Sequence, residues 1–183
     1  IAVPIRWVLW KQANTKVLLA EVTGIDISNK RVKFINQTMQ YDMLVLAVGV
    51  SHDYFGNEDW AKYAPGLKSV DDALELRQRI LMAYEQAEWS TNPEDQRKLL
   101  TFVVVGGGAT GVEMAGALSE IARQTLLQDF RNIDSSDAHV VLIEGGNRLL
   151  PGFREPIPEN ARKQLESIGV EVITNEQVTK IDE

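Results

Sequence analysis

Three glycines at positions 106, 108 and 111 follow the pattern Gly-x-Gly-x-x-Gly, between an apolar run and an apolar stretch of helical spacing. In this pattern the first glycine permits a sharp reversal, and the second leaves no side chain where a pyrophosphate approaches the backbone. The third lets a helix pack closely on the strand, so that the helix directs its unpaired N–H groups at the phosphates. The pattern predicts a dinucleotide cradle rather than a turn that serves packing alone, formed by Gly106, Gly107, Gly108, Ala109, Thr110 and Gly111.

An acidic residue, Glu144, ends the next apolar run at residues 140–143. A carboxylate at this position accepts hydrogen bonds from a ribose 2′-hydroxyl and repels a 2′-phosphate, which favours NAD over NADP. Glu144 lies 38 positions after Gly106, whereas the usual spacing is about 20. The additional residues fall within the polar segment 123–138, which we expect to extend a helix end and a loop away from the ligand.

The order of elements around these residues is that of an α/β protein. Apolar strands alternate with helices, which predicts a Rossmann-like parallel sheet wound through right-handed crossovers. The expected strands cover residues 100–105, 140–143 and 169–173, and the expected helices cover residues 112–127 and 159–168, the second closed by Gly169.

The first part of the chain is expected to be rich in β structure. Strands are predicted at 15–22, 31–35 and 41–48, with a turn at 27–30 and a short helix at 5–12 whose Trp7 and Trp10 need apolar cover. Residues 52–66 are expected to form a loop or hinge, and a helix capped by Ser69 then runs to about Trp89. A weak repeat at an offset of 156 residues aligns residues 17–26 with residues 173–182, and hints at two similar nucleotide-binding units in tandem.

Composition excludes several classes of function. A net charge of −7 argues against a nucleic-acid partner, and no apolar run approaches the length of a membrane span. Without cysteine the chain has no disulfide, zinc cluster or thiol nucleophile, and His52 and His139 match no metal spacing, so no metal is expected. The chain begins with Ile1 instead of Met, and we expect it to be an internal piece of a longer protein.

Several motifs together resemble type II NADH dehydrogenase, the single-polypeptide NADH:quinone oxidoreductase among the flavoproteins with two dinucleotide-binding domains. The resemblance covers essentially the whole chain. It is carried by residues 41–49, 54–56, 67–74 and 106–113, and by Glu144 with residues 148–151. One departure is Val48, where the family's second flavin motif has threonine; a backbone contact is expected there, so the change is tolerable.

The resemblance implies that residues 1–56 are the C-terminal part of an FAD-binding unit, with Ala47, Val48 and Gly49 against FAD. Residues 57–183 would form a truncated NADH-binding domain, in which Glu113 is catalytic and lies near the nicotinamide in the first turn of its helix. Hydride would pass from NADH to FAD, and electrons then to a quinone. For Glu113 the competing interpretation is an acid that complements the helix dipole.

The resemblance also implies a cytoplasmic protein with peripheral contact to a membrane through regions absent from this chain, and it is compatible with a homodimer. We expect the chain alone to be soluble, to bind NADH weakly at most, to carry no FAD and to be inactive. Arg148 is expected to tether its loop rather than to bind a cofactor.

Other functions share these sequence features. A flavoprotein reductase of the ferredoxin, sulfide:quinone or disulfide type would have the same architecture. An NAD-sensing module would use the same glycine turn without catalysis. A plain Rossmann dehydrogenase has the poorest support, because neither histidine is placed as an acid/base group.

Overall fold

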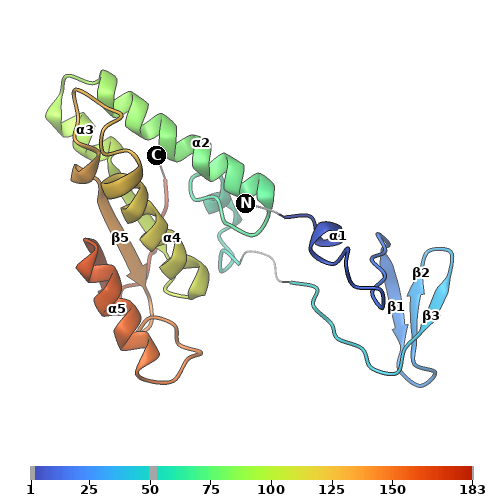
Figure 1. Cartoon of the computed structure of the whole chain (residues 1–183). Helices are drawn as coiled ribbons and strands as arrows, with labels where there is room; N and C mark the ends of the chain where they lie inside the picture. Colours follow the sequence, from blue (N-terminus) through green and yellow to red (C-terminus); the bar gives the residue numbers. More distant parts are fainter. Residues whose placement is uncertain (1–2, 50–52, 183) are drawn as a thin grey trace. The chain divides into compact units, whose positions relative to one another are not determined.

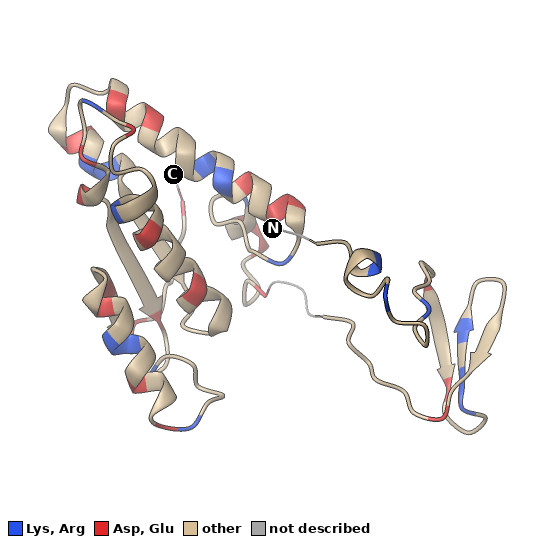
Figure 2. Ribbon diagram, in the orientation of Figure 1, with Lys and Arg blue, Asp and Glu red and all other residues tan. Residues whose placement is uncertain are grey.

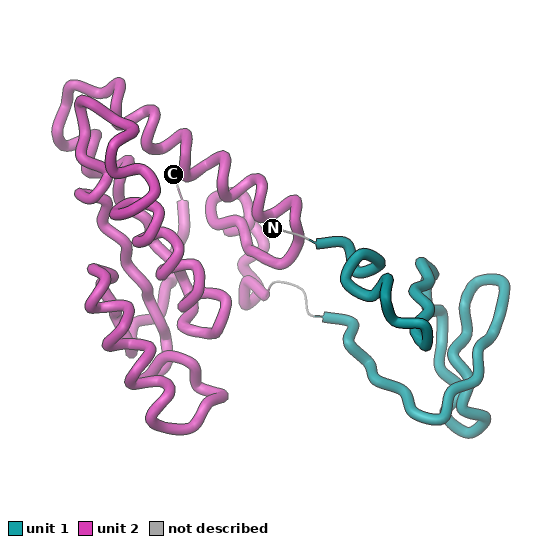
Figure 3. The backbone as a smooth tube through the Cα atoms, in the orientation of Figure 1, with its two compact units in different colours: residues 1–51 teal, residues 52–183 magenta. Residues whose placement is uncertain are grey.

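The computed structural model describes residues 3–49 and 53–182 of the 183-residue chain. It divides the chain into two compact units, residues 1–51 and residues 52–183 (Figure 3). The predicted α/β fold class is confirmed, because a three-stranded parallel sheet with helices forms the second unit. The prediction for His52 lies outside the described residues.

An antiparallel meander is the main feature of the first unit. The strands follow one another in the sheet, which agrees with the predicted turn at residues 27–30 and with the predicted strand that begins at Arg31. The Asp26 carboxylate stabilises this turn, because it accepts the Asn29 N–H at 3.0 Å. The elements of the unit are α1 (Ile5–Val8), β1 (Val22–Asp26), β2 (Arg31–Phe34) and β3 (Thr38–Gln40) (Figure 1).

Three predictions for the first unit were wrong in extent. The helix expected at 5–12 is only α1, the strand expected at 15–22 includes only Val22, and residues 41–48 form no strand. A buried strand needs a hydrogen-bonded neighbour and apolar cover. In the described residues no strand pairs with this segment, and its backbone contact is a single bond from the Tyr41 N–H to the Lys30 carbonyl at 3.0 Å. Trp7 and Trp10 likewise remain 68% and 69% exposed.

The predicted repeat is not reflected in secondary structure. Residues 22–26 form β1, whereas the aligned residues 178–182 have no strand. Conversely, Ile173 lies in a strand of the second unit and its counterpart Val17 does not. The sequence matches therefore do not correspond to matching elements in the described structure.

The second unit is built on a parallel sheet in which consecutive strands are neighbours. Its strands are β4 (Thr101–Val105), β5 (His139–Glu144) and β6 (Val170–Thr174), all as predicted to within one or two residues. Helix α4 (Ala109–Glu120) contacts all three strands, and α5 (Ile157–Ser167) contacts β6 and α4 (Figure 1). Gly169, with φ of +85°, ends α5 as expected.

The remaining helical segments of the second unit are short, apart from the predicted long helix α2. They are η1 (Glu58–Lys62), α2 (Val70–Trp89), α3 (Pro93–Leu99), the π-turn η2 (Ile121–Thr125) and η3 (Ser135–Asp137). Ser69 caps α2 as predicted: its hydroxyl accepts the Asp72 N–H at 3.1 Å, and the Asp72 carboxylate accepts the Ser69 N–H at 2.8 Å.

Helix α2 is fixed to the rest of the second unit by one aromatic and one acidic side chain. Tyr84 is 1% exposed, and the centroid of its ring lies 5.6 Å from that of Phe102 and 5.7 Å from that of Phe130. The Glu88 carboxylate accepts backbone N–H groups at 3.1, 2.9 and 3.2 Å from the loop before β5, those of Arg131, Asn132 and Ile133. The long insertion before β5 is therefore tied to α2.

The burial of Tyr84 predicts a loss of stability at high pH. Burial raises the pKa of the Tyr84 phenol to about 12 from 10, although the Arg123 guanidinium opposes this. The unfolded chain ionises this tyrosine first, so its contribution is complete below pH 10 and is lost as the pH rises to about 12. That loss amounts to about 2 to 3 kcal/mol.

Tyr84→Phe should remove this pH dependence. The difference between the urea midpoints of wild type and variant should be constant up to pH 10 and should then shift in favour of the variant as the pH approaches 12. Tyrosinate absorbance, compared between the same two proteins, checks the ionisation directly. Ionisation of Tyr84 near pH 10 in the folded protein would contradict the prediction.

Candidate functional site

The glycine turn lies at the carboxyl end of β4, and Gly106 makes the reversal. Its φ of +105° falls in a region that side chains disfavour, and its N–H donates to the Ile143 carbonyl at 2.8 Å. The conformational role predicted for the first glycine is thus confirmed.

Gly111 lets α4 approach the end of β4. A Cβ atom at this position would lie 1.9 Å from the Gly106 carbonyl oxygen, far inside any real contact. The third glycine is therefore required by packing, as the pattern predicted, and it holds the start of α4 directly beside the turn.

Gly108 is the N-cap of α4, and no protein atom occupies the space beside it. Its φ is −71°, no side chain caps the helix, and a Cβ built on it would meet nothing within 4 Å. The N–H groups in the first turn of a helix have no intrahelical acceptor, and among the described residues none is supplied to Ala109, Thr110 or Gly111. Since Ala109 and Thr110 are also exposed, this end of α4 is open to an anion.

Two amides of the predicted cradle are already engaged within the protein. The Gly106 N–H donates to Ile143, and the Gly107 N–H donates to the Glu144 carboxylate at 2.5 Å. The free donors therefore lie toward α4 rather than along the whole of residues 106–111.

Glu144 ends β5 beside the glycine turn, because β4 and β5 are parallel neighbours. Its Oε2 accepts the Gly107 N–H at 2.5 Å and its Oε1 accepts the Gly146 N–H at 2.6 Å. The side chain is only partly buried, and each oxygen keeps acceptor capacity for a hydroxyl. The free amides at the start of α4 and the Glu144 carboxylate thus lie together where β4 and β5 end.

The insertion that separates the turn from Glu144 lies at the opposite end of the strands, where β4 and β5 begin. The loop ends where the His139 N–H donates to the Leu100 carbonyl at 2.9 Å, at the amino ends of β4 and β5. The expectation that the extra residues point away from the glycine turn is confirmed.

The loop between β5 and α5 packs on the glycine turn, a contact that sequence reasoning missed. Leu149 is 1% exposed, and the Leu150 N–H donates to the Gly107 carbonyl at 2.7 Å. Arg148 donates to the Pro151 carbonyl at 3.1 Å, and so tethers its own loop as expected. The only sequence signal for this contact is the apolar pair at 149–150 close after Glu144.

Glu113 lies one turn farther along α4 than predicted. Because α4 begins at Ala109, Glu113 is its fifth residue, and no acid occupies the first turn. The interpretation of Glu113 as a first-turn acid is therefore wrong. Its side chain is exposed, and among the described residues it forms no hydrogen bond or ion pair.

The predicted flavin contacts lie in the first unit. Ala47, Val48 and Gly49 belong to the segment that forms no strand, and Val48 is 90% exposed. Gly49 has φ of +71° and open space where a Cβ would stand, which suits a close backbone contact. Residues 43–49 form no backbone hydrogen bond with any described residue.

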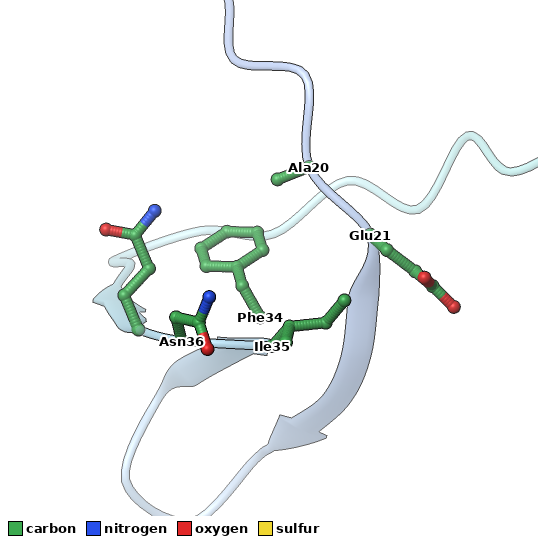
Figure 4. Close-up of a pocket in the computed structure, with 6 residues that line it drawn as sticks. Ala20, Glu21, Phe34, Ile35 and Asn36 are labelled. Atoms are coloured by element: carbon green, nitrogen blue, oxygen red, sulfur yellow. The ribbon is translucent and has the colours of Figure 1, made fainter.

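Other candidate sites carry little chemistry. His139 contacts Glu171 at 2.7 Å, and the described residues contain no group of three or more side chains placed to hold a metal. A hollow of about 170 Å³ in the first unit (Figure 4) is lined by Ala20, Glu21, Phe34, Ile35, Asn36 and Gln37. Lys and Arg are spread over both units (Figure 2), and no described helix is long and apolar enough to span a membrane.

Comparisons with known proteins point to one family. The family model for pyridine nucleotide-disulphide oxidoreductase matches residues 8–183. The chain is 48% identical over 186 aligned residues to the type II NADH:quinone oxidoreductase Ndh of Mycobacterium tuberculosis, covering 100% of this chain and 40% of that protein. The chain therefore spans less than half of that relative.

Two solved structures share the fold. The structure of NDH2 from Plasmodium falciparum in complex with NADH is 30% identical, with a TM-score of 0.69 over 90% of this chain and 34% of that one. An NAD-dependent persulfide reductase from A. fulgidus is 25% identical, with a TM-score of 0.57 over 95% of this chain and 28% of that one.

Proposed function

Because this chain belongs to the pyridine nucleotide-disulphide oxidoreductase family, we propose that it binds NADH within a flavoprotein that reduces a quinone. The observation that carries the proposal is the free helix end at Ala109 and Thr110 beside the Glu144 carboxylate. Donors for a diphosphate and an acceptor for a ribose thus occur together. The names of the relatives, NADH:quinone oxidoreductase and NDH2, support the same function.

The proposal assigns a role to each part of the site. Gly108 and the amides of residues 109–111 hold the pyrophosphate, and Glu144 accepts the ribose hydroxyls and repels a 2′-phosphate. Glu113 acts at the nicotinamide end, where its exposed carboxylate is free to interact. NADH supplies the hydride and FAD carries the electrons onward, so the protein contributes binding, orientation and electrostatics.

We extend the proposal to the domain organisation. Residues 1–56 form the C-terminal part of an FAD-binding unit, in which Ala47, Val48 and Gly49 contact the flavin through their backbone. Residues 57–183 form the NADH-binding domain. The unpaired backbone of residues 43–49 and the space beside Gly49 support the flavin contact.

An assay of the complete protein tests the reaction. Steady-state NADH oxidation with a soluble quinone should exceed oxidation with a disulfide, with ferricyanide as a general electron acceptor for comparison. The likeness to a persulfide reductase makes a sulfur substrate the main competitor. Faster turnover with a disulfide or persulfide would favour that competitor, and NADH binding without turnover would favour a sensing module.

Glu113→Ala is expected to lower kcat/KM for NADH by about tenfold, because one charged contact is worth roughly this much. Stopped-flow absorbance, which follows reduction of the flavin at increasing NADH concentrations, measures the loss. Glu120→Ala is the matched control, since Glu120 is another exposed acid of α4, two turns farther along. Unchanged oxidation by the Glu113 variant would remove that residue from the nicotinamide site.

We also propose that the complete protein contacts a membrane surface and that it forms a homodimer. A respiratory quinone is held in the membrane by its isoprenoid tail, so a protein that reduces it has to reach a bilayer surface. Vesicle co-sedimentation and light scattering of the complete protein test the two statements separately.

A further inference from the structure

Gly107 is the one glycine of the turn that the Gly-x-Gly-x-x-Gly pattern does not require, yet it is buried and closely surrounded. Its N–H donates to Glu144 at 2.5 Å, and its carbonyl accepts the Leu150 N–H at 2.7 Å. A Cβ here would lie 2.7 Å from Leu149 Cδ2 and 2.9 Å from Glu144 Oε2. Because Gly107 has no side chain, the glycine turn can contact both the end of β5 and the loop that follows it.

We propose that Gly107 is a positioning residue for the ribose-binding acid, a proposal that rests on the proposed NADH function. Its amide holds one carboxylate oxygen of Glu144 while the Gly146 amide holds the other at 2.6 Å. Each oxygen has two lone pairs, so one acceptor site on each remains for a ribose hydroxyl. The carboxylate is thus oriented before the nucleotide arrives, which reduces the ordering cost of binding.

The surroundings determine which group must yield if a methyl group is added. Leu149 is 1% exposed and packed in the core, whereas Glu144 is only partly buried. Gly107→Ala should therefore displace the Glu144 carboxylate and break its bond to the turn. The free amides of residues 109–111 lie beyond this contact and should still meet a pyrophosphate.

The test is equilibrium binding of NADH and NADPH to the complete protein, followed by nicotinamide fluorescence. Gly107→Ala should weaken NADH binding by about tenfold, the equivalent of one charge-assisted hydrogen bond. NADPH binding should change less, so the preference for NADH shrinks; in turnover, KM should rise by more than kcat falls. Gly116→Ala is the matched control, because its Cβ would meet Leu165 at an ordinary 3.8 Å.

A further variant separates positioning from damage to the fold. If thermal melting shows that Gly107→Ala does not fold, Gly107→Ala with Leu149→Ala relieves the packed contact and should still lose the preference. Wild-type selectivity in whichever of these two variants folds overturns the positioning role. A wild-type protein that binds neither nucleotide, or that prefers NADPH, instead overturns the proposed function.

Discussion

Gly111→Ala should abolish NADH binding and destabilise the second unit at the same time. The added methyl group would lie 1.9 Å from the Gly106 carbonyl oxygen, and a backbone atom cannot rotate away. Overpacking of this kind costs about 3 kcal/mol, and relief requires α4 to move off the end of β4. Thermal melting and NADH titration of the complete protein should both show the loss.

Gly108→Ala is the control that separates binding from folding. Its φ of −71° suits any residue, and a Cβ there meets no protein atom. The melting temperature should therefore fall only slightly, since replacing glycine by alanine at an N-cap costs about 1 kcal/mol or less. NADH binding should still weaken by about tenfold or more, because the methyl group occupies the approach of the pyrophosphate. Unchanged NADH binding by this variant would contradict a diphosphate site at the turn.

Glu144→Arg should reverse the preference between the two nucleotides. The substitution removes the acceptor for the ribose hydroxyls and supplies a guanidinium for a 2′-phosphate. We expect the ratio of the NADH and NADPH dissociation constants to shift by roughly 100-fold toward NADPH. Part of the lost NADH affinity will come from the turn, because the Gly107 and Gly146 amides also lose their acceptor.

Glu171→Arg provides the matched control for this charge change. Glu171 is an exposed acid of the same sheet that contacts His139 near the amino ends of the strands. Its removal should leave the ratio of the two dissociation constants unchanged. An equal shift in both variants would mean that general charge, and not the contact at Glu144, determines nucleotide choice.

The sequence was most informative where neighbouring residues determine the local structure. The cap at Ser69 lies three residues from Asp72, its partner in the capping box, and the glycine turn joins a strand and a helix that are adjacent in the chain. In such cases the interacting groups are close in sequence, so their pattern predicts the structure. The boundaries of β4, β5 and β6 also agreed, because the apolar composition of each strand is visible in the local sequence, although its partner strand is distant in the chain.

Predictions that depended on distant partners were less successful. The apolar residues 41–48 have the composition of a buried strand, but composition does not supply the neighbour that a strand must pair with. The contact between Gly107 and Glu144 joins groups 37 residues apart. Glu144 was expected to bind a nucleotide, and its bond to the turn followed from no local pattern.

The loop before β5 is bound to α2, and this contact determines where a fragment that contains only the nucleotide-binding domain would have to begin. The Glu88 carboxylate accepts three backbone N–H groups from the loop before β5, and the Tyr84 ring packs against Phe102 and Phe130. A fragment that starts at β4 would leave those amides and aromatic rings facing water. The shortest autonomous piece should therefore start upstream of Ser69, well before the first strand of its own sheet.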